Sequence, residues 1–119
     1  MQFTTTTSAI VLATLAGFPS LAAAIGCTTR GQGIASADQW TIFDVAGVTD
    51  PDGLCNGLRD NLHHFGDCTE SNYGCRMVGD RFEWQFTTPI GCNDGMVQSA
   101  WWEATRNKFG ALPDCTKYI

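Results

Sequence analysis

The chain has 119 residues, with 12 acidic and 7 basic side chains and a net charge of −5 at pH 7. It contains no run of Lys and Arg, so it is a poor candidate for binding nucleic acid or an anionic membrane surface. The length allows one small domain with a core of its own.

Residues 1–24 carry no charged side chain. An apolar run from Ala9 to Phe18 is followed by Pro19 and then by small residues up to Ala24. This order predicts a secretory signal peptide over residues 1–24, with one mature domain over residues 25–119. A membrane anchor is the competing interpretation, but the run is shorter than the roughly 20 residues that span a bilayer.

All six cysteines follow residue 24: Cys27, Cys55, Cys68, Cys75, Cys92 and Cys115. An even number of cysteines in a small exported chain predicts three disulfides and an extracellular location. The sequence leaves the pairing open. Zinc is the alternative, but no C-x-x-C occurs, and neither His63 nor His64 has the spacing of a zinc finger. We therefore expect neither a metal nor a cofactor.

Residues 27–38 are rich in Gly, Ser, Thr and Ala, and we expect an irregular arm held by Cys27. Residues 39–48 are rich in β-branched and aromatic side chains and predict a strand whose alternation is imperfect. A helix is expected from Asp50, which can cap it, with Pro51 at the first helical position. Its apolar stripe would be Leu54, Cys55, Leu58, Leu62 and Phe65, and Gly66 would end it.

Residues 73–78 and 81–87, joined by Gly79-Asp80, predict a β-hairpin. If Val78 pairs with Arg81, one face is wholly apolar or aromatic, with Met77 opposite Phe82, Cys75 opposite Trp84 and Tyr73 opposite Phe86. The other face then places Arg76 opposite Glu83 and Gly74 opposite Gln85. A shift of one residue would destroy both matches.

A second helix can begin at Asn93 or Asp94, with a buried stripe of Val97, Ala100, Trp101 and Ala104. We expect Arg106 and Lys108 in its last turn and Gly110 as its stop. Residues 115–119 predict a short final strand. The element order β-α-β-β-α-β predicts an α+β sandwich of the split β-α-β, or ferredoxin-like, type, stabilised by disulfides.

The leader, the six cysteines, the acidic domain and this element order resemble the small secreted cysteine-rich proteins of filamentous fungi. Within that group the chain is most similar to effectors related in fold to the killer toxins of smut fungi. The likeness is carried by Cys55 and Cys92, each near the start of a helix, and by the hairpin between them. It implies a disulfide-stapled β-α-β-β-α-β domain and carries no functional residue over.

The chain offers few catalytic groups. His63 and His64 are adjacent near the end of the first predicted helix, where a cation suits the helix dipole, and adjacent helical residues cannot chelate one metal. A small secreted ribonuclease could be assembled from Glu70, one of these histidines and Arg76, but nothing in their spacing brings them together. We therefore expect no enzymatic activity and no catalytic residue.

Binding surfaces are better supported. Trp102 is expected to point away from the buried stripe of the second helix, with Arg106 on the same side, unless the arm over residues 27–38 covers it. The open face of the sheet, with Arg76, Glu83 and Gln85, is the second candidate surface. Trp40, Trp84 and Trp101 are expected in the core.

These observations predict a secreted effector-like protein that binds a host or competitor protein, or a cell-surface component, outside the producing cell. We expect it to bind no nucleic acid and not to insert stably into membranes. A membrane-active toxin of the killer type is one alternative, which the acidity of the chain disfavours. A small secreted hydrolase such as a ribonuclease is the other.

Overall fold

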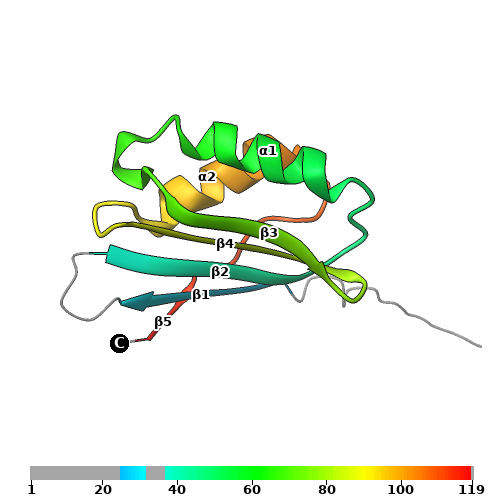
Figure 1. The fold of residues 1–119 in the computed structure, drawn as a ribbon, viewed down its shortest axis with the longest axis horizontal. Helices are drawn as coiled ribbons and strands as arrows, with labels where there is room; N and C mark the ends of the chain where they lie inside the picture. The colour runs from blue at the N-terminus through cyan, green and yellow to red at the C-terminus, as the bar shows by residue number, and fades with distance from the viewer. Residues whose placement is uncertain (1–24, 32–36, 119) are drawn as a thin grey trace, which may run out of the picture.

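The computed structural model describes residues 25–31 and 37–118. The predicted signal peptide and residues 32–36 of the expected arm lie outside these ranges. Two helices lie on one face of a single sheet, which makes the fold α+β as expected (Figure 1). The elements are β1 (Gly26–Gly31), β2 (Ala37–Ala46), α1 (Pro51–Leu62), the short 3₁₀ helix η2 (Gly66–Cys68), β3 (Ser71–Val78), β4 (Arg81–Pro89), α2 (Asp94–Thr105) and β5 (Thr116–Tyr118).

The sheet has five strands in the order β3-β4-β2-β1-β5. Strand β1 corrects the prediction of an irregular arm, because residues 26–31 pair antiparallel with β2 and parallel with β5. Cys27 and Thr29 are buried and alternate with more exposed neighbours, which is the pattern of a strand with one covered face. The predicted four-stranded split β-α-β order is not confirmed, since β1 lies between β2 and β5.

The imperfect alternation of β2 has a local cause. Trp40 and Ile42 are buried, but the next buried side chain is Val45, three residues on. The register with β4 shifts between Ile42 and Val45, and Asp44 has a φ of 64°. The bulge adds one residue to β2, so the buried side chains are even-numbered before it (Trp40 and Ile42) and odd-numbered after it (Val45). The strand therefore contributes side chains to the core on both sides of the bulge.

The hairpin register is confirmed from Val78–Arg81 through Gly74–Gln85. Beyond Gly74 the register shifts, and Asn72 takes a left-handed φ of 50°, so the predicted Tyr73–Phe86 pair is not part of the regular ladder. The two rings still lie 6.5 Å apart between centroids. The apolar face of the hairpin therefore packs under the helices although its first residues are displaced.

Both helices begin where expected. The Asp50 carboxylate accepts a hydrogen bond from the Gly53 N–H, and the Asn93 side chain accepts one from the Met96 N–H. Both end earlier than predicted. Helix α1 ends at Leu62, so Phe65 lies beyond it and Gly66 is not its stop.

Helix α2 ends at Thr105, and its C-cap Arg106 takes a left-handed φ of 53°. The prediction that Arg106 and Lys108 occupy its last turn, and that Gly110 stops it, is therefore wrong. Asn107 also has a left-handed φ, of 57°, and these two residues turn the chain away from the helix axis.

The core is aromatic. Trp40, Trp84, Phe86 and Trp101 are fully buried, as expected for the three tryptophans. Ring centroids lie 6.1 Å apart for Trp40 and Phe86, 4.5 Å for Trp84 and Phe86, and 6.2 Å for Trp84 and Trp101. The chain of rings thus runs from the sheet into α2, and it joins the two layers through large buried surfaces.

All six cysteines form disulfides: Cys27–Cys115, Cys55–Cys75 and Cys68–Cys92. The first joins β1 to the segment that enters β5, the second joins α1 to β3, and the third joins η2 to the loop before α2. Each disulfide therefore joins two different parts of the fold, as expected for a small domain of this kind.

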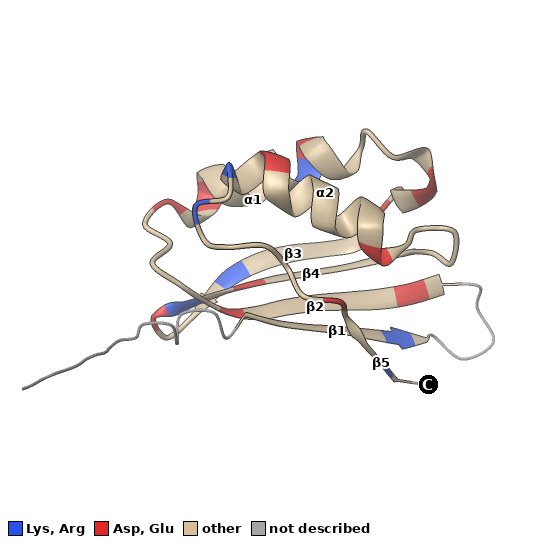
Figure 2. Ribbon diagram, turned by 180° about the vertical axis from the view of Figure 1, so that it is seen from behind, with Lys and Arg blue, Asp and Glu red and all other residues tan. Residues whose placement is uncertain are grey.

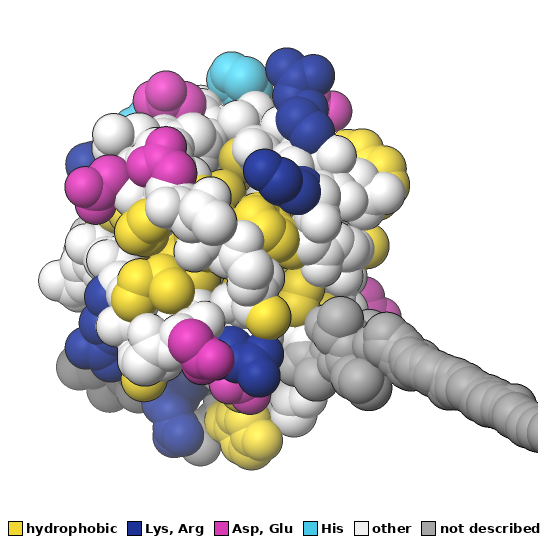
Figure 3. All heavy atoms as spheres, turned by 90° about the vertical axis from the view of Figure 1, so that its right-hand side faces the viewer, with side chains coloured by type: hydrophobic (Ala, Val, Ile, Leu, Met, Phe, Trp, Pro, Cys, Tyr) yellow, Lys and Arg dark blue, Asp and Glu magenta, His cyan; other side chains and the backbone are white. Residues whose placement is uncertain are grey.

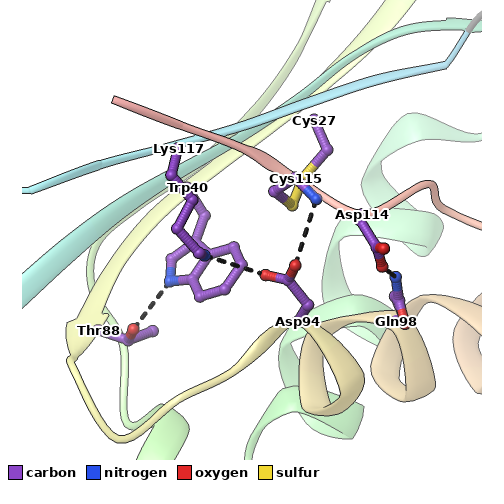
Figure 4. Close-up of a disulfide and its surroundings, with 8 residues drawn as sticks. All are labelled: Cys27, Trp40, Thr88, Asp94, Gln98, Asp114, Cys115 and Lys117. Atoms are coloured by element: carbon purple, nitrogen blue, oxygen red, sulfur yellow. Dashed lines mark hydrogen bonds and ion pairs between the residues drawn. A yellow bond between two sulfur atoms is a disulfide. The ribbon is translucent and has the colours of Figure 1, made fainter. Parts of the chain in front are cut away.

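The Cys27–Cys115 disulfide lies beside a polar clamp formed by the first residue of α2 (Figure 4). The carboxylate of Asp94 accepts a hydrogen bond from the Cys115 N–H at 3.4 Å and lies 3.3 Å from Nζ of Lys117. The same ammonium lies 5.3 Å from the centroid of the Trp40 ring. This clamp fastens the three-residue strand β5, whose side chains are exposed, to the helix layer.

Candidate functional site

Trp102 is exposed on α2, with 46% of its surface accessible, whereas its neighbour Trp101 is fully buried. This agrees with the predicted outward orientation. The Gly26–Gly31 part of the expected arm lies in the sheet and not over α2. Arg106 is the C-cap of α2 and has a left-handed φ of 53°, so it does not continue the regular helix face on which the sequence placed it beside Trp102.

A groove of about 530 Å³ lies where the start of α1 meets the end of α2. It is lined by Val48, Thr49, Asp50, Gly53, Leu54, Ala104, Thr105, Arg106, Lys108 and Phe109. A second hollow of about 400 Å³ shares Lys108 and Phe109 with it and extends toward Ile25 and Ala46. Figure 3 views this end of the molecule, where hydrophobic side chains are exposed between charged ones.

The cations of the chain fall into two groups. Five of the seven Lys and Arg side chains have a partner among the described residues: Arg59 with Glu70, Arg76 with Glu83, Arg81 with Asp80, Lys117 with Asp94, and Arg30 with the Tyr118 ring. In the same described part of the chain, Arg106 and Lys108 have no such partner. Both line the groove, and sequence reasoning missed this because it depends on where α2 ends.

The face of the sheet opposite the helices is covered by no element of the described chain (Figure 2). The predicted ion pair is present there, with Arg76 Nε 2.9 Å from an oxygen of Glu83. The side-chain amide of Gln85 lies 3.4 Å from Thr41 Oγ1. The three predicted residues of this face therefore lie together, engaged with one another or with neighbouring strands.

A cluster at the end of α1 brings together residues whose spacing in the sequence does not predict contact. Nε2 of His63 lies 2.6 Å from one carboxylate oxygen of Glu70, and Arg59 donates to the other at 2.9 Å. Burial acts to raise the pKa of Glu70, but hydrogen bonds from its own backbone, His63 and Arg59 outweigh it, so this pKa is lowered. Arg59, and not Arg76, supplies the cation, since Arg76 lies on the opposite face of the sheet.

The Arg59 guanidinium also lies 5.1 Å from the centroid of the Tyr73 ring. The Tyr73 hydroxyl donates to the Cys55 carbonyl at 2.6 Å, and burial raises the pKa of this phenol to about 12. Tyr73 therefore remains protonated over the physiological range. The cluster as a whole fastens the last turn of α1 to the start of β3.

The chemistry available to this cluster is restricted by access. The side chain of Glu70 is only 3% exposed, whereas that of His63 is 50% exposed. A general base must reach the proton that it removes, and only His63 is accessible enough to do so. No group of three or more His, Cys, Asp or Glu side chains in the described chain is arranged to hold a metal ion.

No family model, no curated protein and no solved structure matches this chain. In the described part of the chain, no helix has the length and apolar character needed to cross a membrane. Function must therefore be argued from the candidate sites described above.

Proposed function

We propose that this protein is secreted and acts by binding a host or competitor target outside the producing cell, in the manner of a cysteine-rich effector. The observation that carries the proposal is the placement of Trp102. A large aromatic side chain on α2 stays 46% exposed while the adjacent Trp101 takes the core position. Tryptophan is enriched among the residues that dominate binding energy at protein interfaces.

Two further observations support it. Three disulfides in a small domain are compatible with an oxidising extracellular compartment. In the only His–Glu contact among the described residues the carboxylate is almost inaccessible, so His63 alone could exchange a proton with a substrate, and this contact does not supply a general acid and a general base together.

The proposal includes kinship in fold with killer-toxin-like effectors. What supports it is the connection β2-α1-β3, in which the two joined strands lie on either side of β4. A β-α-β unit divided by an intervening strand is what the resemblance implies. In this proposal β1 is an addition to that unit.

The test is to apply labelled, oxidised mature protein to plant leaf discs and to yeast cells, and to measure both binding and electrolyte leakage. Reduced and alkylated protein is the control for the fold. We expect disulfide-dependent binding to one cell type that Trp102→Ala weakens at least about tenfold. Ile90→Ala is the matched variant, because Ile90 is also exposed, at 63%, but lies in the loop before α2.

The result that would contradict the proposal is binding to neither cell type, or binding that survives reduction. Leakage from protein-free liposomes would instead indicate a membrane-active toxin.

A ribonuclease is the second candidate, favoured by the one observation that His63, Glu70 and Arg59 meet. In this role His63 would be the proton-transferring group, Glu70 would orient its ring, and Arg59 would stay with Glu70. Cleavage of RNA that is abolished in His63→Ala and retained in His64→Ala would establish it. No cleavage by the wild-type protein would reject it.

A further inference from the structure

The groove between the helix ends combines an apolar floor with two unpaired cations. Leu54 and Phe109 are half-buried and pack against the core, and Val48 does the same from the loop before α1. Arg106 and Lys108 are exposed and line the same groove. A volume of about 530 Å³ lies within the range of ligand sites in proteins, roughly 300–1,000 Å³.

The backbone at Arg106 is a second, independent observation. A left-handed C-cap position favours glycine, because any Cβ there is costly, and Arg106 has a φ of 53°. The following Asn107 is also left-handed, although Asn tolerates this region better. Strained positions of this kind are concentrated at functional sites. The strain at Arg106 holds a free guanidinium at the groove where glycine would be more stable.

We propose that this groove binds a short segment of the target protein in which an apolar side chain stands next to an acidic one. The apolar side chain would cover Leu54 and Phe109, and the carboxylate would pair with Arg106 and Lys108. The inference rests on the proposed function and names the part of the target that is recognised. The groove itself contains one carboxylate, that of Asp50, which accepts a hydrogen bond from the Gly53 N–H as the cap of α1.

Charge decides which partner fits. The chain carries a net charge of −5, so a polyanion such as nucleic acid, or a strongly acidic surface, is repelled by most of the molecule. A segment with one or two carboxylates meets a local excess of positive charge in the groove, where Arg106 and Lys108 outnumber Asp50. An apolar neighbour adds buried area that a free phosphate or acetate cannot supply.

The experiment is selection of binders from a displayed library of random peptides on immobilised, oxidised protein. Dissociation constants of the selected peptides are then measured on variants. Arg106→Gly removes the cation and relieves the left-handed backbone, so we expect the helix end to stay folded in this variant. Lys108→Gln removes the second cation. Arg81→Gln is the matched control, since it changes the net charge equally at an exposed arginine outside the groove.

We expect selected peptides to carry Asp or Glu beside an apolar residue. Their binding should weaken about tenfold or more in Arg106→Gly, and also in Lys108→Gln, while Arg81→Gln changes it less than about twofold. Raising the salt concentration should weaken binding to the wild type and have less effect on Arg106→Gly.

Peptides without acidic residues, or binding that is equal in Arg106→Gly and the wild type, would overturn the inference. A selection that yields no binders would also overturn it. If no peptide binds but decanoate shifts the NMR resonances of the groove residues, the groove would be assigned to a fatty acid and the inference would be overturned. These outcomes are separable from failure of the proposed function. Selected peptides that bind the groove, with no cellular target found, would leave the inference standing and reject the function.

Discussion

Nε2 of His63 lies 2.6 Å from Oε1 of Glu70, and Oε2 of the same carboxylate accepts a hydrogen bond from Arg59 at 2.9 Å. His63 and Arg59 belong to the end of α1, and Glu70 immediately precedes β3. One nearly inaccessible carboxylate thus closes the turn that contains η2, and it does so beside the Cys68–Cys92 disulfide.

Replacing Glu70 with Gln should lower the free energy of unfolding by about 1–2 kcal/mol at pH 7. The neutral amide keeps the shape of the side chain but weakens charge-assisted hydrogen bonds from Arg59 and His63. Urea unfolding monitored by tryptophan fluorescence is the measurement. Glu103→Gln, at an exposed position on α2, serves as the comparison and should change stability by less than about 0.5 kcal/mol.

The same carboxylate makes stability depend on pH. Its folded pKa is below the ordinary value of 4.5, so its contribution is complete above the unfolded pKa. This contribution to stability is lost as the pH falls from the unfolded pKa through the lower folded pKa, because below the folded pKa the native state binds the proton as well. Wild-type protein should therefore lose more stability than Glu70→Gln between pH 7 and pH 3. Parallel loss in both proteins would show that Glu70 is not the group concerned.

The two adjacent tryptophans of α2 should respond in opposite ways. Trp101→Ala should cost about 3–5 kcal/mol of stability, because the ring is fully buried against Trp84 and its Nε1–H donates to the Gly110 carbonyl. Trp102→Ala should cost less than about 1 kcal/mol while it weakens target binding. Chemical unfolding and the cell-binding assay measure the two effects. A loss of several kcal/mol in Trp102→Ala would place that residue in the core and remove it from the interface.

Much of this fold could be predicted from the sequence where a signal is local. The hairpin register followed from matching apolar and charged pairs, and the cap at Asp50 followed from a short motif. Strand β1 was missed because the alternation of Cys27 and Thr29 is short and lies in a segment rich in small residues. Its pairing with β5 depends on a contact across 88 residues, which no local pattern encodes.

The candidate sites were harder to predict because each depends on an exception to a regular pattern. Helix α2 ends at Thr105, and its C-cap Arg106 takes a left-handed conformation that favours glycine, so the side chains there predicted a longer helix. The bulge at Asp44 hid the buried face of β2. Glu70 meets His63 only because α1 stops at Leu62 and η2 turns the chain back.

The Cys27–Cys115 disulfide should stabilise the domain more than Cys68–Cys92. The first closes a loop with a sequence separation of 88 and the second closes one of 24. Loop-closure entropy favours the longer loop by about 1 kcal/mol. The pairs are well matched because all four cysteines are buried, so the double alanine variants leave similar cavities. Equal unfolding free energies for Cys27→Ala/Cys115→Ala and Cys68→Ala/Cys92→Ala would contradict the entropic argument.

Gly26 should not tolerate a side chain. It pairs with Phe43 across β1 and β2, and a Cβ built at Gly26 would overlap the Phe43 ring. Gly26→Ala should therefore destabilise the fold by about 1–3 kcal/mol, and adding Phe43→Leu should recover part of that loss. Thermal denaturation of the two variants is the check. Gly74→Ala is the control, since no atom lies within 4 Å of the Cβ built there.

The covalent link between β1 and the start of β5 also determines how the molecule responds to attack by a protease. Any single cut between Cys27 and Cys115 leaves two pieces that are still joined through sulfur. Where the cut falls in a loop, the sheet and the aromatic core hold both pieces in register, so the nicked molecule keeps its surface. The cut would be detected only after reduction of the disulfides, when two shorter chains separate. A protein built this way can lose the continuity of its backbone without losing its shape.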